Sequence, residues 1–215
     1  MPKYSPYAQL GLWRNPFGEL TWQERAELAV LDLESAVAFL SDVRQPRRAV
    51  HIQGDCGFGK TTHLLALRAA MPAAEYIYYP EEGPRPALPR QSALLLVDEA
   101  QRMGWRRRRQ MLSSGGPLAI ATHVDLTDAL LQAGFEVLRI DAETPKSPAQ
   151  LSAILQRRID ASRSTDSPLP APQISLATAE LLQRSFGSNL RRIENFLYEQ
   201  VQQLVTESKS WPPAV

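Results

Sequence analysis

The sequence predicts an α/β fold in which a five-stranded parallel β-sheet is flanked by helices and followed by a small C-terminal α-helical subdomain. Three observations support this prediction. From residue 49 onward, short apolar runs alternate with helical stretches, the pattern of a parallel sheet with crossover helices. Two of these runs end in a glycine-rich segment and in a pair of acids. Past residue 140 the apolar runs stop, and amphipathic segments with a helical period replace them.

The composition is that of a folded domain. The chain has 215 residues, of which 44% are hydrophobic and 22% charged, and its formal net charge is +1. A near-neutral chain is not a wholesale binder of polyanions. Its single cysteine, Cys56, has no partner for an internal disulfide, and no run approaches the roughly 18 apolar residues of a membrane span. The first residues also lack the layout of a signal peptide, so we expect a cytoplasmic protein with no membrane partner.

Two segments precede the sheet. Residues 1–20 carry aromatic residues, glycine and proline without helical periodicity, which predicts an extended segment. Thr21 and Glu24 then form a capping-box signature, and apolar residues recur on one face until Pro46. We therefore expect one continuous helix between Thr21 and Pro46.

The alternating region supplies five expected strands and three expected helices. The strands are predicted over residues 49–53, 75–79, 93–97, 118–122 and 135–140. The helices are predicted over residues 60–70, 100–112 and 126–133. Residues 80–91 contain four prolines, so we expect this link to run extended over the surface.

Three amphipathic helices are expected after the sheet. Ser147 followed by Pro148 is typical of an N-cap with proline at the first helical position. Ser175 caps a second helix that Gly187 ends, and a third helix runs from about Asn189 to residue 205. A loop rich in serine and proline separates the first two.

The segment after the first strand matches G-x-x-x-x-G-K-[ST], the motif of a phosphate-binding loop. Its glycines let backbone N–H groups turn toward a phosphate, and the next helix directs its positive N-terminus there. We expect Lys60 to reach the β- and γ-phosphates of ATP and Thr61 to hold Mg²⁺. Cys56 is either an oxidisable thiol or an interchangeable loop residue. The residues expected to bind the nucleotide are Gly54, Asp55, Cys56, Gly57, Phe58, Gly59, Lys60, Thr61 and Thr62.

Polar side chains end two further strands. Asp98 and Glu99 follow an apolar run, and a strand buried on both faces delivers such acids to the C-terminal edge of the sheet, where ligands bind. We expect Asp98 to hold Mg²⁺, mostly through water, and Glu99 to polarise the water that attacks the γ-phosphate. Thr122 and His123 end a third strand. Thr122 is expected to hydrogen-bond the γ-phosphate or the water, and His123 is a second candidate, although both also fit plain strand-end polar residues.

With these motifs in this order, the chain resembles the AAA+ ATPases over nearly its whole length. Within them it is most similar to the subgroup of bacterial replication initiators, origin-recognition ATPases and transposon or secretion accessory ATPases. The resemblance rests on residues 54–61 as Walker A, residues 94–99 as Walker B, Thr122 as sensor 1 and residues 188–194 as sensor 2. It implies a P-loop NTPase fold with strand order 5-1-4-3-2, an ATPase core over residues 21–143, a lid over residues 144–207 and a flexible tail over residues 208–215.

The resemblance also implies roles for residues outside these motifs. Arg191 would be the sensor-2 arginine that contacts a phosphate, with Arg192 as its substitute; the alternative is an ordinary solvated arginine. Residues 1–20 would line the adenine pocket, where Phe17 or its neighbours Trp13, Asn15 and Pro16 would touch the base or merely anchor the segment.

Two features depart from the family pattern. The segment between Lys60 and Asp98 is short and proline-rich where the family normally has a helix and often a pore insertion, so we do not expect a polymer to be threaded. Residues 127–138 contain no arginine where the family usually carries a finger that completes a neighbour's site, so shared active sites are not implied.

Arginine outnumbers lysine by 20 to 4, a bias that genome composition also produces. A cluster of these arginines follows the two acids. Adjacent cations repel one another, so they predict a surface for an anionic partner such as DNA, RNA, an acidic protein or a neighbouring subunit's phosphates. A solvated helix face is the alternative. The cluster consists of Arg102, Trp105, Arg106, Arg107, Arg108 and Arg109.

These observations predict a small ATPase that binds and hydrolyses ATP with Mg²⁺ and acts as a conformational switch on a protein partner, on a second copy of itself or on nucleic acid. Two alternatives remain open at this point. One is a P-loop kinase of a small molecule, and the other is a module that binds ATP with little turnover.

Overall fold

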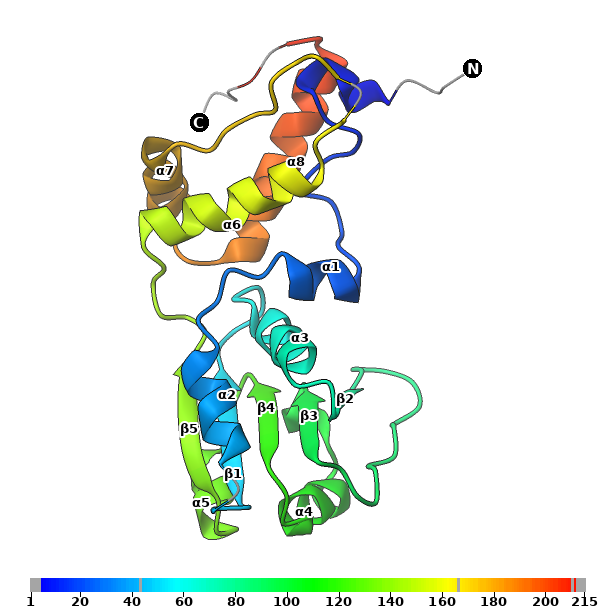
Figure 1. The fold of residues 1–215 in the computed structure, drawn as a ribbon, viewed down its shortest axis with the longest axis vertical. Coiled ribbons are helices and arrows are strands. Elements are labelled where there is room, and N and C mark those ends of the chain that lie inside the picture. Colours follow the sequence, from blue (N-terminus) through cyan, green and yellow to red (C-terminus); the bar gives the residue numbers. More distant parts are fainter. Residues whose placement is uncertain (1–4, 43, 166, 210, 212–215) are drawn as a thin grey trace. The chain divides into compact units, whose positions relative to one another are not determined.

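A computed structural model describes residues 5–42, 44–165, 167–209 and 211 (Figure 1). The chain forms two compact units. Residues 25–143 make up one, here called the sheet unit. The N-terminal segment as far as Glu24 and the chain from Thr144 onward make up the other, here called the helical unit.

The sheet unit is built on five parallel strands in the order β2-β3-β4-β1-β5, which confirms the predicted order. The register aligns the C-terminal ends of neighbouring strands: Tyr78 lies beside Asp98, and Gln53 lies beside Thr122. Side chains that end these strands therefore meet at one edge of the sheet. The strands are β1 (Arg48–Gln53), β2 (Ala74–Tyr78), β3 (Leu94–Asp98), β4 (Leu118–Thr122) and β5 (Glu136–Asp141).

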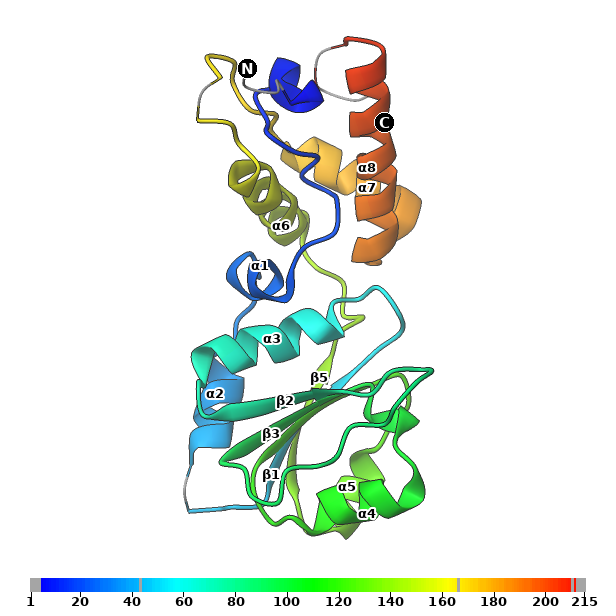
Figure 2. The same cartoon turned by 90° about the vertical axis from the view of Figure 1, so that its right-hand side faces the viewer.

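Helices cover both faces of this sheet (Figures 1 and 2). The strand side chains alternate between the two faces, so Leu94 and Leu96 enter one apolar core and Leu95 and Val97 the other. This two-sided burial explains why the strands have almost unbroken apolar sequences. Helices α2 (Glu34–Ser41) and α3 (Lys60–Ala70) cover the first face, and α4 (Trp105–Ser113) and α5 (Thr127–Gln132) cover the second.

The helix expected between Thr21 and Pro46 is wrong as a single element, because the chain forms α1 (Trp22–Glu27) and, after a break, α2. The predicted capping box at Thr21 and Glu24 is present. The break has a local cause, since the Asp32 carboxylate accepts the backbone N–H of Glu34 at 3.0 Å and so starts a new helix.

The helix expected over residues 100–112 is also divided, into the 3₁₀ helix η2 (Ala100–Arg102) and α4. Gly104 separates them with an extended backbone at φ −63° and ψ 154°. The proline-rich link of residues 80–91 forms neither helix nor strand, as predicted.

The helical unit consists of α6 (Pro148–Ala161), α7 (Leu176–Phe186), α8 (Leu190–Thr206) and the N-terminal segment, which contains the 3₁₀ helix η1 (Pro6–Leu10). Ser147, Ser175 and Asn189 cap the three α-helices through side-chain oxygens, the first in a complete capping box. Residues 1–4 lie outside the described part of the segment, and 210 and 212–215 outside that of the expected tail.

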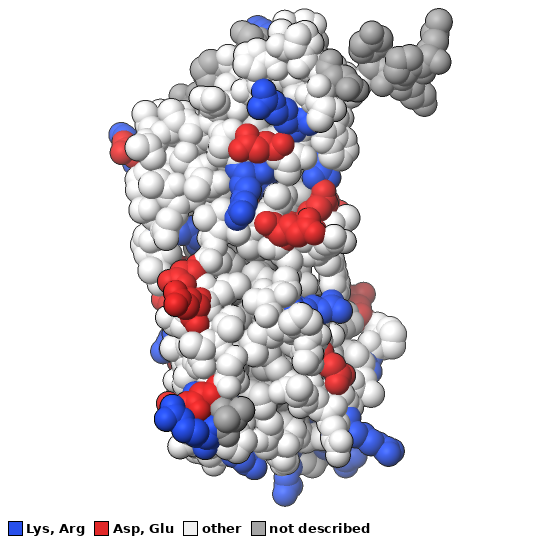
Figure 3. Space-filling model, viewed as in Figure 1, with Lys and Arg blue, Asp and Glu red and all other residues white. Residues whose placement is uncertain are grey.

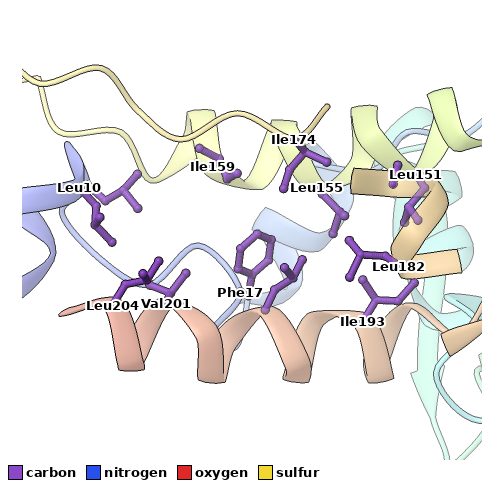
Figure 4. Close-up of a cluster of buried hydrophobic side chains, with 13 residues drawn as sticks. Leu10, Phe17, Leu151, Leu155, Ile159, Ile174, Leu182, Ile193, Val201 and Leu204 are labelled. Carbon is purple, nitrogen blue, oxygen red and sulfur yellow. The ribbon is translucent and has the colours of Figure 1, made fainter. Parts of the chain in front are cut away.

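The N-terminal segment is part of the helical core (Figure 4). Leu10, Leu12 and Phe17 pack among the buried residues of α6, α7 and α8. The buried guanidinium of Arg158 on α6 holds the segment in place, donating to the carbonyls of Pro16 at 2.9 Å and Gly18 at 2.6 Å. It also forms an ion pair with Glu194 on α8.

None of the helices in the described ranges combines the length and the apolar character that crossing a bilayer requires.

Candidate nucleotide-binding site

The loop between β1 and α3 follows a backbone path that requires glycine. Gly54, Gly57 and Gly59 have φ angles of 151°, 94° and 89°, values that residues with a side chain rarely adopt. A β-carbon on Gly54 would also meet the Glu143 side chain at 3.1 Å and that of Ala142 at 3.2 Å. The glycines of the motif therefore shape the loop that leads into the N-terminus of α3.

Lys60 is the first residue of α3, and its side chain folds back over the loop. It is 5% exposed, and its Nζ donates to the Asp55 carbonyl at 2.8 Å and lies 3.5 Å from His123 Nδ1. Burial lowers the pKa of Lys60, although the carboxylate of Glu99 opposes this effect. The ammonium is thus desolvated beside backbone N–H groups, a setting that favours an anionic ligand.

Thr61 and Asp98 meet across the gap between α3 and β3. The Thr61 hydroxyl donates to Asp98 Oδ2 at 2.7 Å, and the Tyr76 hydroxyl donates to the same oxygen at 2.8 Å. Burial raises the pKa of Asp98, and the hydrogen bonds from Thr61 and Tyr76 act in the opposite direction. Burial and the Asp98 carboxylate raise the pKa of Tyr76, so this phenol stays a donor.

The Thr61–Asp98 pair fits Mg²⁺ bound together with a nucleotide. Mg²⁺ prefers oxygen ligands and is usually held by one or two carboxylates and by substrate phosphates, not by an all-protein cage. One buried carboxylate beside one hydroxyl, next to the glycine-rich loop, matches that set. The described residues contain no group of three or more His, Cys, Asp or Glu side chains that could hold a metal ion.

Glu99 has an unusual backbone and a shared carboxylate. Its φ of 57° is in the left-handed region, a strained conformation that often occurs at functional sites. Its Oε2 accepts from Gln101 Nε2 at 2.7 Å and lies 3.2 Å from Arg102 Nη2 and 3.3 Å from His123 Nε2. The His123 ring therefore lies between Lys60 and Glu99, within reach of both.

Thr122 is not part of this cluster. Its hydroxyl donates to the Val124 carbonyl at 2.6 Å and is 2.8 Å from His51 Nε2, inside the unit. Ala121 pairs with Asp98 and shares its face, so the next residue, Thr122, points to the opposite face. The structure thus brings His123, and not Thr122, to Lys60 and Glu99. The alternation of side-chain direction along β4 is the sequence signal that distinguishes His123 from Thr122.

The other loop residues differ in their surroundings. Asp55 and Cys56 are exposed, whereas Phe58 packs against the apolar core under α2 and α3, and Thr62 is half-buried. The Asp55 N–H donates to Glu143 Oε1 at 2.6 Å. Glu143 lies two residues after the end of β5 and so belongs to the same edge of the sheet.

Tyr76, Gln101 and Glu143 contact the site and were not singled out by the sequence motifs. Tyr76 belongs to no motif, and its contact with Asp98 depends on how β2 pairs with β3. For Glu143 there was a signal, since it lies two residues after a strand that ends at this edge.

Phe17 and Arg191 belong to the helical unit. The Phe17 ring is 5% exposed and lies in the helical core, with the Arg158 guanidinium 6.0 Å from its centroid. Arg191 is exposed in the first turn of α8, directly after the N-cap and Leu190.

The arginine cluster is divided between contacts within the unit and solvent. Arg102 reaches inward to Glu99 and to the Tyr79 carbonyl at 3.3 Å, and Arg108 donates to the Gln101 carbonyl at 3.1 Å. Arg107 is half-buried, whereas Trp105, Arg106 and Arg109 are exposed. Arg102 and Arg108 are half-buried and use part of their hydrogen-bonding capacity within the unit, so the anion-binding surface over all six residues stays a prediction.

Comparison with known proteins bears on the fold. No protein-family model matches the sequence, and no curated protein matches it. Among solved structures, the chain is similar to the crystal structure of domain III from the Thermotoga maritima replication initiation protein DnaA, with a TM-score of 0.53 and 15% sequence identity. The similarity covers 91% of this chain and 94% of that chain. At this identity it shows that the two chains share an α/β fold with C-terminal helices.

Proposed function

We propose that this protein is a small AAA+-type ATPase that binds ATP with Mg²⁺, hydrolyses it and acts as a conformational switch on a partner. One observation carries the proposal: Lys60, the Thr61–Asp98 pair and Glu99 converge at one edge of the sheet, around a loop shaped by glycines. Phosphate binding, metal binding and water activation are the three tasks of phosphoanhydride hydrolysis, and each has a suitable group here.

Each side chain has a distinct role in this proposal. The loop N–H groups and Lys60 hold the β- and γ-phosphates, and Thr61 and Asp98 hold Mg²⁺, which would withdraw charge from the phosphate oxygens when bound. Glu99 accepts the proton of the attacking water. His123 orients Glu99, because its two ring nitrogens reach Glu99 and Lys60 at the same time.

Two residues of the helical unit keep the roles that the family resemblance implies. Arg191, exposed in the first turn of α8, is the residue to which the resemblance assigns a phosphate contact. For the base, Trp13 is a better candidate than Phe17, because Trp13 is 50% exposed whereas the Phe17 ring is buried in the core. The Arg14 guanidinium lies 4.5 Å from the Trp13 ring centroid, so this indole already takes part in a stacking contact of the kind that adenine would make.

The Glu99→Gln variant tests hydrolysis. We expect it to retain ATP, measured by equilibrium binding of a fluorescent analogue, and to lose at least roughly 100-fold in phosphate release, because an amide cannot accept the proton. Lys60→Ala should lose both activities. Glu75→Gln, the same change at an exposed position on β2, is the matched control and should match the wild type.

Two other results would replace this assignment. If wild type and Glu99→Gln bind ATP equally and neither releases phosphate, the protein is an ATP-binding module with little turnover. This second candidate is favoured by the surroundings of Glu99, because Gln101, Arg102 and His123 already share its Oε2 and so compete with a water molecule for it. If neither Lys60→Ala nor Gly54→Ala weakens ATP binding, the site is not the phosphate loop.

A further inference from the structure

The solvent face of α4 is a surface that the proposed ATP chemistry does not use. We call it the α4 face. At 3.6 residues per turn its members share one side of the helix, while Met111 on the other side is buried. The α4 face consists of Trp105, Arg106, Arg109, Gln110 and Ser113, all of them exposed.

The charge on this helix is positive and uncompensated. Helix α4 has no acidic residue, and within the described ranges Arg106, Arg107 and Arg109 form no ion pair. These cations lie in the first turns of the helix, whose N-terminus is already positive, so the arrangement costs stability without a ligand. Figure 3 shows Lys and Arg side chains projecting along the lower edge of the sheet unit, and Figure 1 places α4 at that edge.

The α4 face also carries an exposed ring. Trp105 is 69% exposed, and the Arg106 guanidinium lies 5.2 Å from its ring centroid. Unpaired bases stack on indole rings and on guanidinium planes, and arginine binds phosphates through paired N–H groups. A duplex keeps its bases stacked inside and an acidic protein has no base to stack, so each would use the charge but not the ring.

We propose that the α4 face binds a single-stranded nucleic acid, with a base stacked on Trp105 and the backbone phosphates paired with Arg106 and Arg109. As the partner of the proposed switch, this ligand rests on the proposed function. The structure connects the two sites: Arg108 on α4 donates to the Gln101 carbonyl at 3.1 Å, and the Gln101 side chain donates to Glu99 at 2.7 Å.

The test measures binding of fluorescent single-stranded oligonucleotides, dT₁₅ and rU₁₅, by anisotropy at low salt and without ATP. We expect Trp105→Ala to weaken binding by roughly tenfold. Arg106→Ala and Arg109→Ala should each reduce the slope of log affinity against log salt by about 0.7. Arg90→Ala removes an exposed arginine from another segment of the same unit and is the matched control. The four substituted side chains are all exposed, so we expect the variants to fold.

Three outcomes would overturn the proposal. The first is no loss for Trp105→Ala relative to Arg90→Ala. The second is equal affinity for a duplex with no effect of Trp105→Ala, which marks a general polyanion surface. The third is equal affinity for poly-glutamate. ATP binding by the wild type and by the same variants is measured in parallel. If the wild type does not bind ATP, the proposed function is contradicted, but the oligonucleotide result stands.

Discussion

The carboxylate of Asp98 depends on a residue outside the sequence motifs. Its Oδ2 accepts hydrogen bonds from Thr61 and from Tyr76, and its Oδ1 accepts the backbone N–H of Glu99 at 3.0 Å. A buried carboxylate needs such donors, because desolvation alone raises its free energy strongly. Tyr76 therefore contributes one hydrogen bond to the Asp98 carboxylate, the group that is expected to hold the metal.

Tyr76→Phe removes this hydroxyl without changing the ring. We expect the free energy of unfolding to fall by about 1–3 kcal/mol, since a buried acceptor loses a donor, and the Mg²⁺ concentration that half-saturates hydrolysis to change. Urea unfolding and a Mg²⁺ titration measure the two effects. Tyr78→Phe, on the same strand but exposed, is the control. Equal behaviour of the two variants would contradict this role of Tyr76.

His51 connects β1, β4 and α5. Its ring lies 2.8 Å from the Thr122 hydroxyl and 3.1 Å from that of Thr127, and it is fully buried. Burial lowers the pKa of His51 below its ordinary value of 6.5, although Asp125 opposes this. The unfolded chain then binds more protons than the folded protein at pH values between the lowered pKa and 6.5.

The contribution of His51 to stability is therefore complete above about pH 6.5 and decreases as the pH falls toward its folded-state pKa. We expect His51→Gln to be less stable than the wild type by about 1–3 kcal/mol at pH 7.5, and the difference to shrink at pH 5.5. Denaturant unfolding at the two pH values measures it. A difference that stays constant would show that His51 is not held neutral.

At the scale of single elements, strands and helices with a strong local signal follow the prediction. The helix predicted over residues 60–70 coincides with α3, and the strand over residues 118–122 coincides with β4. The signals were unambiguous there: a glycine loop before a helix, and an apolar run buried on both faces. Asp98 and Glu99 could be assigned to the sheet edge for the same reason.

The features that could not be predicted from the sequence depend on tertiary contacts, or on a side chain that competes with the helix for a backbone N–H group. Apolar residues between α1 and α2 keep a helical period, but the Asp32 carboxylate offers the backbone another partner. The Tyr76–Asp98 contact requires the register of two strands that are distant in sequence. Thr122 was favoured over His123 because the hydroxyl matched the family pattern, whereas the alternation of the strand favours His123.

The capping box of α6 gives an element-scale prediction. Ser147 accepts the N–H of Gln150 at 3.1 Å, and the Gln150 side chain accepts the N–H of Ser147 at 2.9 Å. Ser147→Ala should lower the stability of the helical unit by about 1 kcal/mol. Ser185→Ala, an exposed change within α7, is the matched control and should have a smaller effect. Thermal unfolding followed by circular dichroism measures both, and equal shifts would count against the cap.

At the scale of the whole molecule, the N-terminal segment completes a core formed by the C-terminal helices. Tyr7 donates to Gln202 at 3.0 Å, and Asn15 donates to the Tyr198 carbonyl at 3.1 Å. Leu12 is fully buried in this core, whereas its neighbour Trp13 is 50% exposed. Stability of the helical unit therefore depends on residues at both ends of the sequence.

Leu12→Ala should destabilise the helical unit by about 2–5 kcal/mol, because it leaves a cavity in a packed core. Trp13→Ala should cost much less. Hydrogen exchange of amides in α6 and α8, compared with amides in β3 and β4, locates the effect. Faster exchange confined to the sheet unit after Leu12→Ala would contradict the assignment of this segment to the helical core.

The pairing of η1 with α8 has a consequence for the order of events during synthesis. The Tyr7–Gln202 hydrogen bond closes a loop of 195 residues, and the whole sheet unit lies within that loop. A ribosome releases residues 25–143 before α8 exists, so the sheet unit can fold first, as domains generally do during translation. Leu10, Leu12 and Phe17 pack against residues of α6, α7 and α8, so their core is complete only when α8 has emerged. The apolar N-terminal segment therefore stays partly exposed in the nascent chain for as long as α8 has not been made.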